Sequence, residues 1–190
     1  MTDPGAPWRP PRSRLRNANH HAVHETEHVP SHHPEHPLIP SGQATLVKDQ
    51  AALLKVVDEL RVSGLFAYDS EFIGEDSYYP HLCLVQVATT ERIYLIDPLA
   101  GVDLKPFWAL VADPSVEKIV HAGQQDVEPV FRILGSDVKP SAIFDTQIAA
   151  AFAQLPYPLS LSKLVATLVG AKMSKGFTVT DWTQRPLSAS

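Results

Sequence analysis

The chain has 190 residues, of which 44% are apolar, and this suits one domain with a substantial buried core. Its formal net charge of −5 excludes a global positive field that would attract nucleic acid or acidic membranes. Apolar runs are only a few residues long, which excludes a membrane-spanning helix. Cys83 is the only cysteine, so neither an intramolecular disulfide nor a cysteine-based zinc site is possible.

Residues 1–40 differ in composition from the rest of the chain. They contain eight of the 17 prolines, seven of the nine histidines and only ten apolar residues. A segment this poor in apolar residues cannot offset the entropy of ordering, so we predict a disordered tail followed by a domain over residues 41–190. The histidines could form a metal-binding tract, but adventitious binding is favoured because an unfolded segment gives no defined ligand geometry.

From residue 41 onward, short apolar strands alternate with segments whose apolar residues recur at helical spacing. In chain order, we predict a strand over 45–47, a helix between the N-cap Asp49 and Gly64, a strand over 65–69, a hairpin of strands 82–89 and 92–96, a helix around 104–111, a strand over 116–121, and helices over 124–134, 146–152 and 161–168. This alternation predicts an α/β fold, and the hairpin makes the sheet mixed.

Two carboxylates, Asp69 and Glu71, stand at the predicted end of the 65–69 strand. Side chains two residues apart in an extended chain share a face, so both can point at one place. Like charges so placed repel each other unless a cation lies between them, and carboxylate oxygens suit Mg²⁺ or Mn²⁺. The plainer interpretation is that the strand has ended and both acids are solvated.

A third carboxylate, Asp126, follows the predicted 116–121 strand and lies just inside the next helix. In α/β sheets this position commonly carries ligand-binding residues. Three converging acids would form a divalent-metal site of the kind used to hydrolyse phosphodiester bonds. The alternative is that Asp126 only stabilises the N-terminal end of its helix.

Six sequence blocks resemble the ribonuclease D family, in the same order and from about Thr45 to the last residue. The blocks are Tyr68–Phe72, Tyr79–Gln86, Ile96–Leu99, His121–Asp126, Phe144–Gln147 and Asp181–Ser188. The resemblance implies a ribonuclease H-like mixed sheet flanked by helices and a 3′–5′ exonuclease domain of the DEDD type. By position, Asp69 and Glu71 match the first exonuclease motif and Asp126 matches the second, and these acids would hold two Mg²⁺ or Mn²⁺ ions.

The resemblance also implies nucleic-acid 3′ ends as the partner and substrate, with RNA and transfer-RNA 3′-end processing expected, and a cytoplasmic protein. The family's third motif, a Tyr and an Asp four residues apart, does not follow Arg185 within the 190 residues. We therefore expect a truncated member with little or no exonuclease activity, or a relative that only binds nucleic acid. Asp145 is interpreted as a supporting or helix-capping acid rather than a metal ligand.

Several other residues have two interpretations each. Lys175 and Arg185 could contact phosphates or be ordinary surface charge. Tyr78 and Tyr79 could stack on a base, although core packing beside Pro80 is favoured. His121 ends an apolar strand and is expected to be a hydrogen-bonded core histidine.

Three functions remain open at this point. The first is a metal-dependent 3′–5′ exonuclease, the second is a catalytically impaired nucleic-acid-binding relative, and the third is a histidine-rich metal-handling protein. The last predicts zinc or nickel affinity that survives Asp126→Ala and is lost when residues 1–40 are removed. The sequence identifies no residue that reads a 2′-hydroxyl group and gives no oligomeric state.

Overall fold

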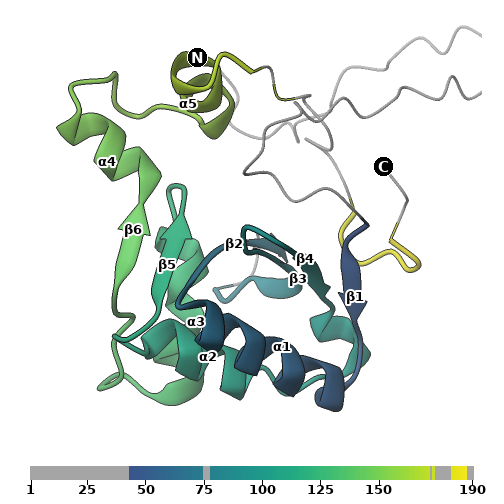
Figure 1. The fold of residues 1–190 in the computed structure, drawn as a ribbon. Coiled ribbons are helices and arrows are strands. Elements are labelled where there is room, and N and C mark those ends of the chain that lie inside the picture. Colours follow the sequence, from purple (N-terminus) through teal and green to yellow (C-terminus); the bar gives the residue numbers. More distant parts are fainter. Residues whose placement is uncertain (1–42, 75–77, 172, 174–180, 188–190) are drawn as a thin grey trace, which may run out of the picture. The chain divides into compact units, whose positions relative to one another are not determined.

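The computed structural model describes residues 43–74, 78–171, 173 and 181–187, which form a six-stranded mixed sheet with helices (Figure 1). The predicted tail, residues 1–40, lies outside the described residues. In chain order the elements are β1 (Thr45–Val47), α1 (Gln50–Ser63), β2 (Leu65–Ile73), β3 (His81–Ala88), β4 (Ile93–Ile96), the 3₁₀ helix η1 (Pro98–Ala100), α2 (Lys105–Ala112), β5 (Glu117–Val120), α3 (Gln124–Leu134), β6 (Ile143–Asp145), α4 (Thr146–Phe152) and α5 (Leu161–Leu168).

The sheet has the strand order β1-β4-β3-β2-β5-β6. The consecutive strands β2, β3 and β4 pair antiparallel, whereas β1 with β4, β2 with β5 and β5 with β6 pair parallel. The predicted β3–β4 hairpin is confirmed, and its turn is closed by the Thr89 backbone N–H, which donates to the Arg92 carbonyl oxygen at 2.9 Å. The α/β class with a mixed sheet is therefore correct.

Two strands differ from the sequence prediction. Strand β2 does not end at Asp69 but continues to Ile73, because β3 pairs with it as far as the Ile73–His81 register. Strand β6 was not predicted, since three residues are too few to show an alternating pattern. The first difference matters for the site, because it places Asp69 and Glu71 inside a paired strand rather than beyond its end.

The predicted boundaries of the first helix are confirmed in detail. The Asp49 side chain accepts a hydrogen bond from the Ala52 backbone N–H at 2.9 Å, which satisfies a free donor at the start of α1. Gly64 ends the helix with a φ of 69°, a left-handed conformation that side chains other than glycine adopt at a cost. The chain then enters β2 directly.

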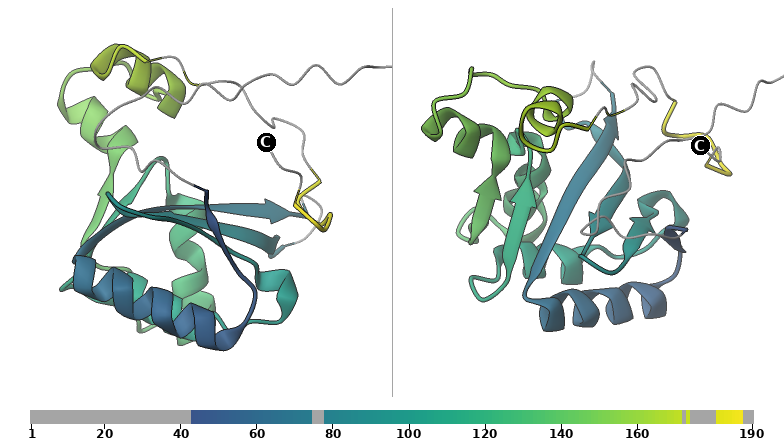
Figure 2. Two further views of the ribbon diagram at one scale, coloured as in Figure 1. Left: turned by 45° about the vertical axis from the view of Figure 1, so that its right-hand side comes forward. Right: turned by 45° about the horizontal axis from the view of Figure 1, so that its top comes forward.

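The main hydrophobic core lies between one face of the sheet and helices α1, α2 and α3, which the two views of Figure 2 show together on that side. Phe66 and Tyr68 of β2 contact Phe107 of α2, with ring centroids 6.0 and 5.7 Å from it. Burial of these large side chains is the principal contribution to stability. A smaller cluster joins Ala150, Leu159 and Leu164 around α4 and α5.

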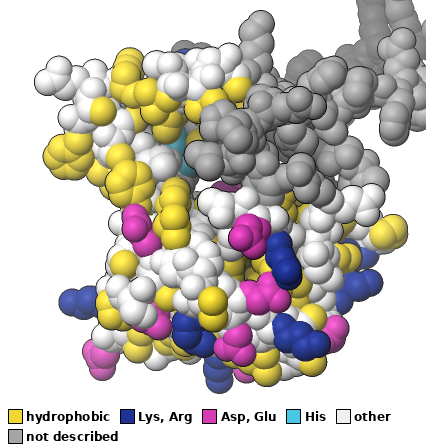
Figure 3. Space-filling model, in the orientation of Figure 1, with side chains coloured by type: hydrophobic (Ala, Val, Ile, Leu, Met, Phe, Trp, Pro, Cys, Tyr) yellow, Lys and Arg dark blue, Asp and Glu magenta, His cyan; other side chains and the backbone are white. Residues whose placement is uncertain are grey.

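Some large apolar side chains lie on the surface instead. On α4 and the loop after it, Ile148, Phe152 and Tyr157 line an open depression, and Figure 3 shows hydrophobic side chains gathered in this region. Tyr78 and Tyr79 are exposed as well, so the expectation that they pack in the core beside Pro80 is wrong. No helix within the described ranges is long and apolar enough to cross a membrane.

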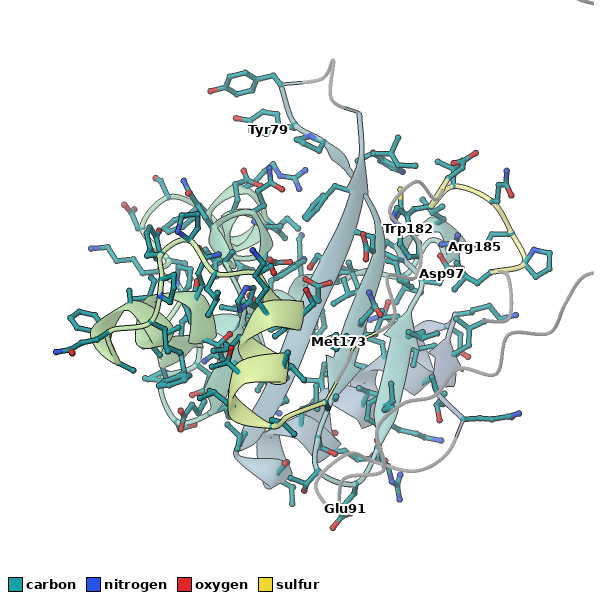
Figure 4. The ribbon with its side chains drawn as sticks, turned by 90° about the horizontal axis from the view of Figure 1, so that it is seen from above. Tyr79, Glu91, Asp97, Met173, Trp182 and Arg185 are labelled. Atoms are coloured by element: carbon teal, nitrogen blue, oxygen red, sulfur yellow. The ribbon has the colours of Figure 1, made fainter. Side chains whose placement is uncertain are left out.

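The segment 181–187 is held to the sheet by Arg185 (Figure 4). Its guanidinium donates two hydrogen bonds of 2.7 Å to the carboxylate of Asp97, which follows β4, and one of 2.8 Å to the Cys83 carbonyl oxygen in β3. It also donates to the carbonyl oxygens of Trp182 and Gln184. The Asp97 side chain is only 4% exposed, so this is a largely buried ion pair.

We predict that Arg185→Ala lowers the free energy of unfolding by about 3 kcal/mol, because it leaves the buried Asp97 carboxylate uncompensated. Arg185→Lys should recover little of this, since an ammonium cannot make the paired hydrogen bonds. Urea denaturation at neutral pH measures both. The matched control is Arg61→Ala, which removes an exposed ion pair with Asp58 and should cost less than about 1 kcal/mol. Equal losses for the two alanine variants would contradict the prediction.

The same ion pair predicts a dependence of stability on pH. Hydrogen bonding from Arg185 holds the pKa of Asp97 below its usual range, although burial opposes this. A depressed pKa contributes stability above the ordinary carboxyl value of about 4, and this contribution is lost as the pH falls further, through the pKa of the folded state. The difference in unfolding free energy between the wild-type chain and Arg185→Ala should therefore shrink at acidic pH.

Candidate active site

The candidate site forms where β2 extends beyond its parallel neighbour. Strand β5 pairs with β2 only over Leu65–Ala67, whereas β3 pairs with β2 as far as Ile73. Beyond Ala67, the edge of β2 that faces β5 therefore has no neighbouring strand among the described residues. The start of α3 approaches this edge, and the Tyr68 hydroxyl donates a hydrogen bond of 3.3 Å to the Asp126 carbonyl oxygen.

Asp69 and Glu71 alternate with core residues along β2. Phe66 and Tyr68 point into the main core, so Asp69 and Glu71 lie on the opposite face of the sheet. Across the ladder, Asp69 is opposite Gln86 and Glu71 is opposite Leu84. The Gln86 side-chain amide donates a hydrogen bond of 3.1 Å to the Glu71 carboxylate, which orients that side chain.

Asp126 is brought to the site by a tight turn between β5 and α3. Gly123 begins α3, and a Cβ atom at this position would lie only 2.5 Å from a methyl carbon of Val120, so only glycine fits without a shift. Ala122 before it adopts a positive φ of 56°. Asp126 follows in the first helical turn and is 7% exposed.

Asp145 fixes this turn from the neighbouring strand. Its carboxylate accepts hydrogen bonds from the backbone N–H groups of Ala122 at 3.1 Å and Gly123 at 3.0 Å. It also caps α4 by accepting from Gln147 at 2.8 Å and Ile148 at 3.4 Å. Burial alone would raise the pKa of Asp145, but these four donors more than offset it and hold the pKa below its usual range. The predicted helix-capping role of Asp145 is confirmed.

The three carboxylates share one electrostatic environment. Burial raises the pKa of Glu71 to about 7, with further contributions from the charges of Asp69 and Asp126. Burial and the charge of Asp69 raise the pKa of Asp126 to about 6. Partial burial also raises the pKa of Asp69, which lies at the exposed rim of the group. Each carboxylate is therefore more difficult to ionise than a solvated one, and a cation would relieve the repulsion.

The buried charges of the described segments show which group lacks a partner. Lys118 donates two hydrogen bonds of 2.7 Å to the carbonyl oxygens of Asp113 and Val116, and Asp97 is paired with Arg185. The Oδ1 atom of Asp126, in contrast, is buried and accepts no hydrogen bond from any residue that the structure describes. Buried charges are normally paired or coordinate a metal, so this oxygen fits a cation.

The carboxylates are close to one another but do not form a preassembled metal site. Among the residues that the structure describes, no three His, Cys, Asp or Glu side chains are gathered closely enough to hold a metal ion. No Lys or Arg of the same residues forms an ion pair with Asp69, Glu71 or Asp126. The hard oxygen donors, the unpartnered buried oxygen and the lack of a compensating side chain together fit Mg²⁺ or Mn²⁺.

His121 closes the other side of the site. One ring nitrogen lies 2.9 Å from the Thr146 hydroxyl and the other lies 2.9 Å from the Leu159 carbonyl oxygen, so the expectation of a hydrogen-bonded histidine is confirmed. Asp69 and His121 also line an apolar cavity of about 650 Å³, together with Leu161 and Met173. The acids therefore face a space in which an organic group could lie beside them.

The fold and the family of the chain are decided by comparison with known proteins. A family model described as a 3′–5′ exonuclease matches residues 44–190. The chain belongs to the 3′–5′ exonuclease family. Within it, the chain is 40% identical over 144 residues to ribonuclease D of Gluconacetobacter diazotrophicus, and this covers 75% of the chain and 36% of that protein. The chain thus spans little more than a third of the length of this protein and of the ribonuclease D proteins of Pseudomonas paraeruginosa and Escherichia coli, to which it is 40% and 35% identical.

Solved structures agree with this assignment to the ribonuclease D group. The crystal structure of Escherichia coli RNase D, described as an exoribonuclease involved in structured RNA processing, matches with a TM-score of 0.69 and 35% identity over 77% of this chain and 39% of that one. Trypanosoma brucei RNase D in complex with RNA U12 matches with a TM-score of 0.65 over 80% of this chain and 56% of that one. At 22% identity, the latter shows only that the exonuclease fold is shared.

The residues expected to contact phosphates have different outcomes. Lys175 lies outside the described residues. Arg185 directs every guanidinium nitrogen at an oxygen of the chain itself, which favours a structural role over phosphate binding.

Sequence reasoning missed two side chains that hold the acids in place. Gln86 orients Glu71, and Tyr68 ties β2 to the first turn of α3. Gln86 had a detectable signal, because it is a polar residue within the otherwise apolar strand β3. Tyr68 had none, since an aromatic residue in a core strand needs no polar partner to explain it.

We predict that Gly123→Ala destabilises the exonuclease domain by about 2 kcal/mol, because the new methyl group meets the buried Val120 side chain. Urea denaturation measures the loss. The matched control is Ala122→Gly at the adjacent position, which should be neutral or slightly stabilising because it relieves a positive φ. A destabilising control or a neutral Gly123→Ala would contradict this account of the turn.

Proposed function

We propose that the chain is a metal-dependent 3′–5′ exonuclease that hydrolyses phosphodiester bonds at RNA 3′ ends, with Asp69, Glu71 and Asp126 as its catalytic and metal-ligating residues. The observation that carries the proposal is the buried, unpartnered Oδ1 of Asp126 beside two further carboxylates of raised pKa. Family membership supplies the reaction class. RNA is favoured over DNA because the ribonuclease D relatives are the most similar proteins described above.

The surroundings of each acid support this proposal. Asp126 is held by the turn that Asp145 fixes, so its carboxylate stays at the open edge of β2. Gln86 orients the Glu71 side chain. Asp69 lies two residues earlier on the same face of β2. When bound by these acids, two Mg²⁺ or Mn²⁺ ions would activate the attacking water and stabilise the leaving 3′-oxygen.

The chain's own residues also restrict where a substrate can lie. The apolar cavity next to Asp69 and His121 can exclude water from one side of the acids, which strengthens electrostatic interactions within the site. With a net charge of −5, the chain does not attract a polyanion through its overall field. Attraction at the site must therefore arise locally, once the negative charge of the three acids has been neutralised.

The first test measures hydrolysis by the 190-residue chain. With Mn²⁺ and a 5′-labelled single-stranded RNA, we expect progressive shortening from the 3′ end that EDTA stops. Asp69→Asn should reduce the rate at least about a hundredfold, because it removes charge stabilisation that acts in the transition state. Short labelled products that appear at once, without a ladder of intermediates shortened from the 3′ end, would indicate internal cleavage and contradict an exonuclease.

The alternative function is distinguished in the same experiment. A chain that binds the RNA but never shortens it, at any Mn²⁺ concentration, would support a relative that only binds nucleic acid. The exposed acid variant Asp58→Asn is the matched control for Asp69→Asn. Asp58 lies on α1 and forms only an exposed ion pair, so its loss should leave the rate unchanged.

The second test measures metal binding without reference to activity. Mn²⁺ should raise the thermal unfolding midpoint of the wild-type chain, because a ligand that binds only the folded state stabilises it. Asp126→Asn should abolish this increase while raising the midpoint in the absence of metal, since it removes a buried like charge. A metal-induced increase that persists in Asp126→Asn would place the metal elsewhere, for example in the histidine-rich residues 1–40.

A further inference from the structure

Two tyrosines project from the sheet at the start of β3. Tyr78 is 89% exposed and Tyr79 is 53% exposed, and their rings meet edge to face with centroids 4.7 Å apart. Figure 4 shows Tyr79 beyond one end of the strands, with Glu91 at the opposite end. An aromatic ring as exposed as that of Tyr78 is unfavourable in water, and exposed apolar patches commonly mark a binding surface.

The tyrosines form one wall of a groove of about 410 Å³. Phe72, at the far end of β2, and Pro80 continue this apolar wall, and Gln125 and Glu128 of α3 form the opposite wall. The Arg132 guanidinium lies 5.5 Å from the centre of the Tyr79 ring and is paired with Glu128 at 3.3 Å. The groove therefore combines exposed aromatic surface with an amide, and Arg132 beside it is already paired with Glu128.

The groove is built on the same two elements that carry the acids of the candidate active site. Phe72 directly follows Glu71 on β2, and Gln125 directly precedes Asp126 on α3. The two elements that carry the acids therefore also carry the two walls of the groove. A polymer whose end lies at the acids can reach the groove within a short stretch of chain, since one strand residue spans only about 3.3 Å.

We propose that the groove binds a nucleobase of a single-stranded nucleic acid, a short distance from the 3′ end held at the acids, with the Tyr78 ring as the stacking surface. The inference rests on the proposed function, because it takes its substrate class from that site. A base fits better than a phosphate, since the Arg132–Glu128 pair leaves no net positive charge in the groove. Base stacking on an aromatic ring needs no charge and tolerates any base.

The experiment measures binding of an RNA of about twelve nucleotides to the full chain in EDTA, by fluorescence anisotropy. Tyr78→Ala should weaken binding by about five- to a hundredfold, and Tyr78→Trp should preserve it, since stacking contributes about 1–3 kcal/mol per base. The loss should be the same at low and at high salt, unlike the loss of a phosphate contact. The matched control is Tyr157→Ala, at another exposed tyrosine that follows α4, and this variant should bind like the wild-type chain.

A scan with single abasic nucleotides locates the contact. At one position along the RNA, removing the base should weaken binding to the wild-type chain but have no effect on Tyr78→Ala. The proposal is overturned if Tyr78→Ala binds like the wild-type chain, if no abasic position shows this coupling, or if the wild-type chain does not bind the RNA. A patch that serves a protein partner instead would give the first of these results.

The two proposals fail separately. Binding that depends on Tyr78 but is never followed by shortening of the RNA in Mn²⁺ would refute the exonuclease and leave the stacking site in place. Shortening that Asp69→Asn abolishes and Tyr78→Ala leaves unchanged, at every RNA length, would refute only the stacking site. Because Asp69→Asn is expected to keep the groove intact, the Tyr78 effect on binding should be present in that background too.

Discussion

The carboxylate of Asp145 is the interaction on which the site depends. It accepts four backbone hydrogen bonds, two from the turn before α3 and two from the start of α4, and it does so from the end of β6. Backbone donors in a turn and at a helix start would otherwise be unsatisfied, so one ionised side chain determines how three elements meet. The position of Asp126 follows from this arrangement, because α3 can start only where the turn allows.

The structure treats its buried charges in two different ways. Lys118 and Asp97 have hydrogen-bond partners within the chain, whereas Asp126 has a buried oxygen that accepts no hydrogen bond from the described residues. Burial and the charges of the neighbouring acids raise the pKa values of Glu71 and Asp126, so these carboxylates destabilise the metal-free chain when they are ionised. Function and stability are in opposition at this place, as is common at sites arranged to bind a charged group.

The sequence predicts features that depend on residues close together in the chain better than features that depend on distant residues. The cap at Asp49, the glycine end at Gly64 and the β3–β4 hairpin follow from local patterns, and they were predicted correctly. The length of β2 depends on a neighbouring strand, and the role of Arg185 depends on Asp97 far away in the chain, so neither could be inferred locally. Tyr78 and Tyr79 show the same limit, because an aromatic pair beside a proline is equally compatible with a core and with a surface.

The Arg185–Asp97 pair also has a consequence for the order of folding. Its two residues are 88 positions apart in sequence, so the contact closes a long loop and cannot form before the last part of the domain has been synthesised. The sheet and its core helices can assemble earlier, from contacts that lie N-terminal to the segment 181–187. During synthesis, Asp97 and the Cys83 carbonyl group therefore lack the Arg185 guanidinium until residue 185 has been added.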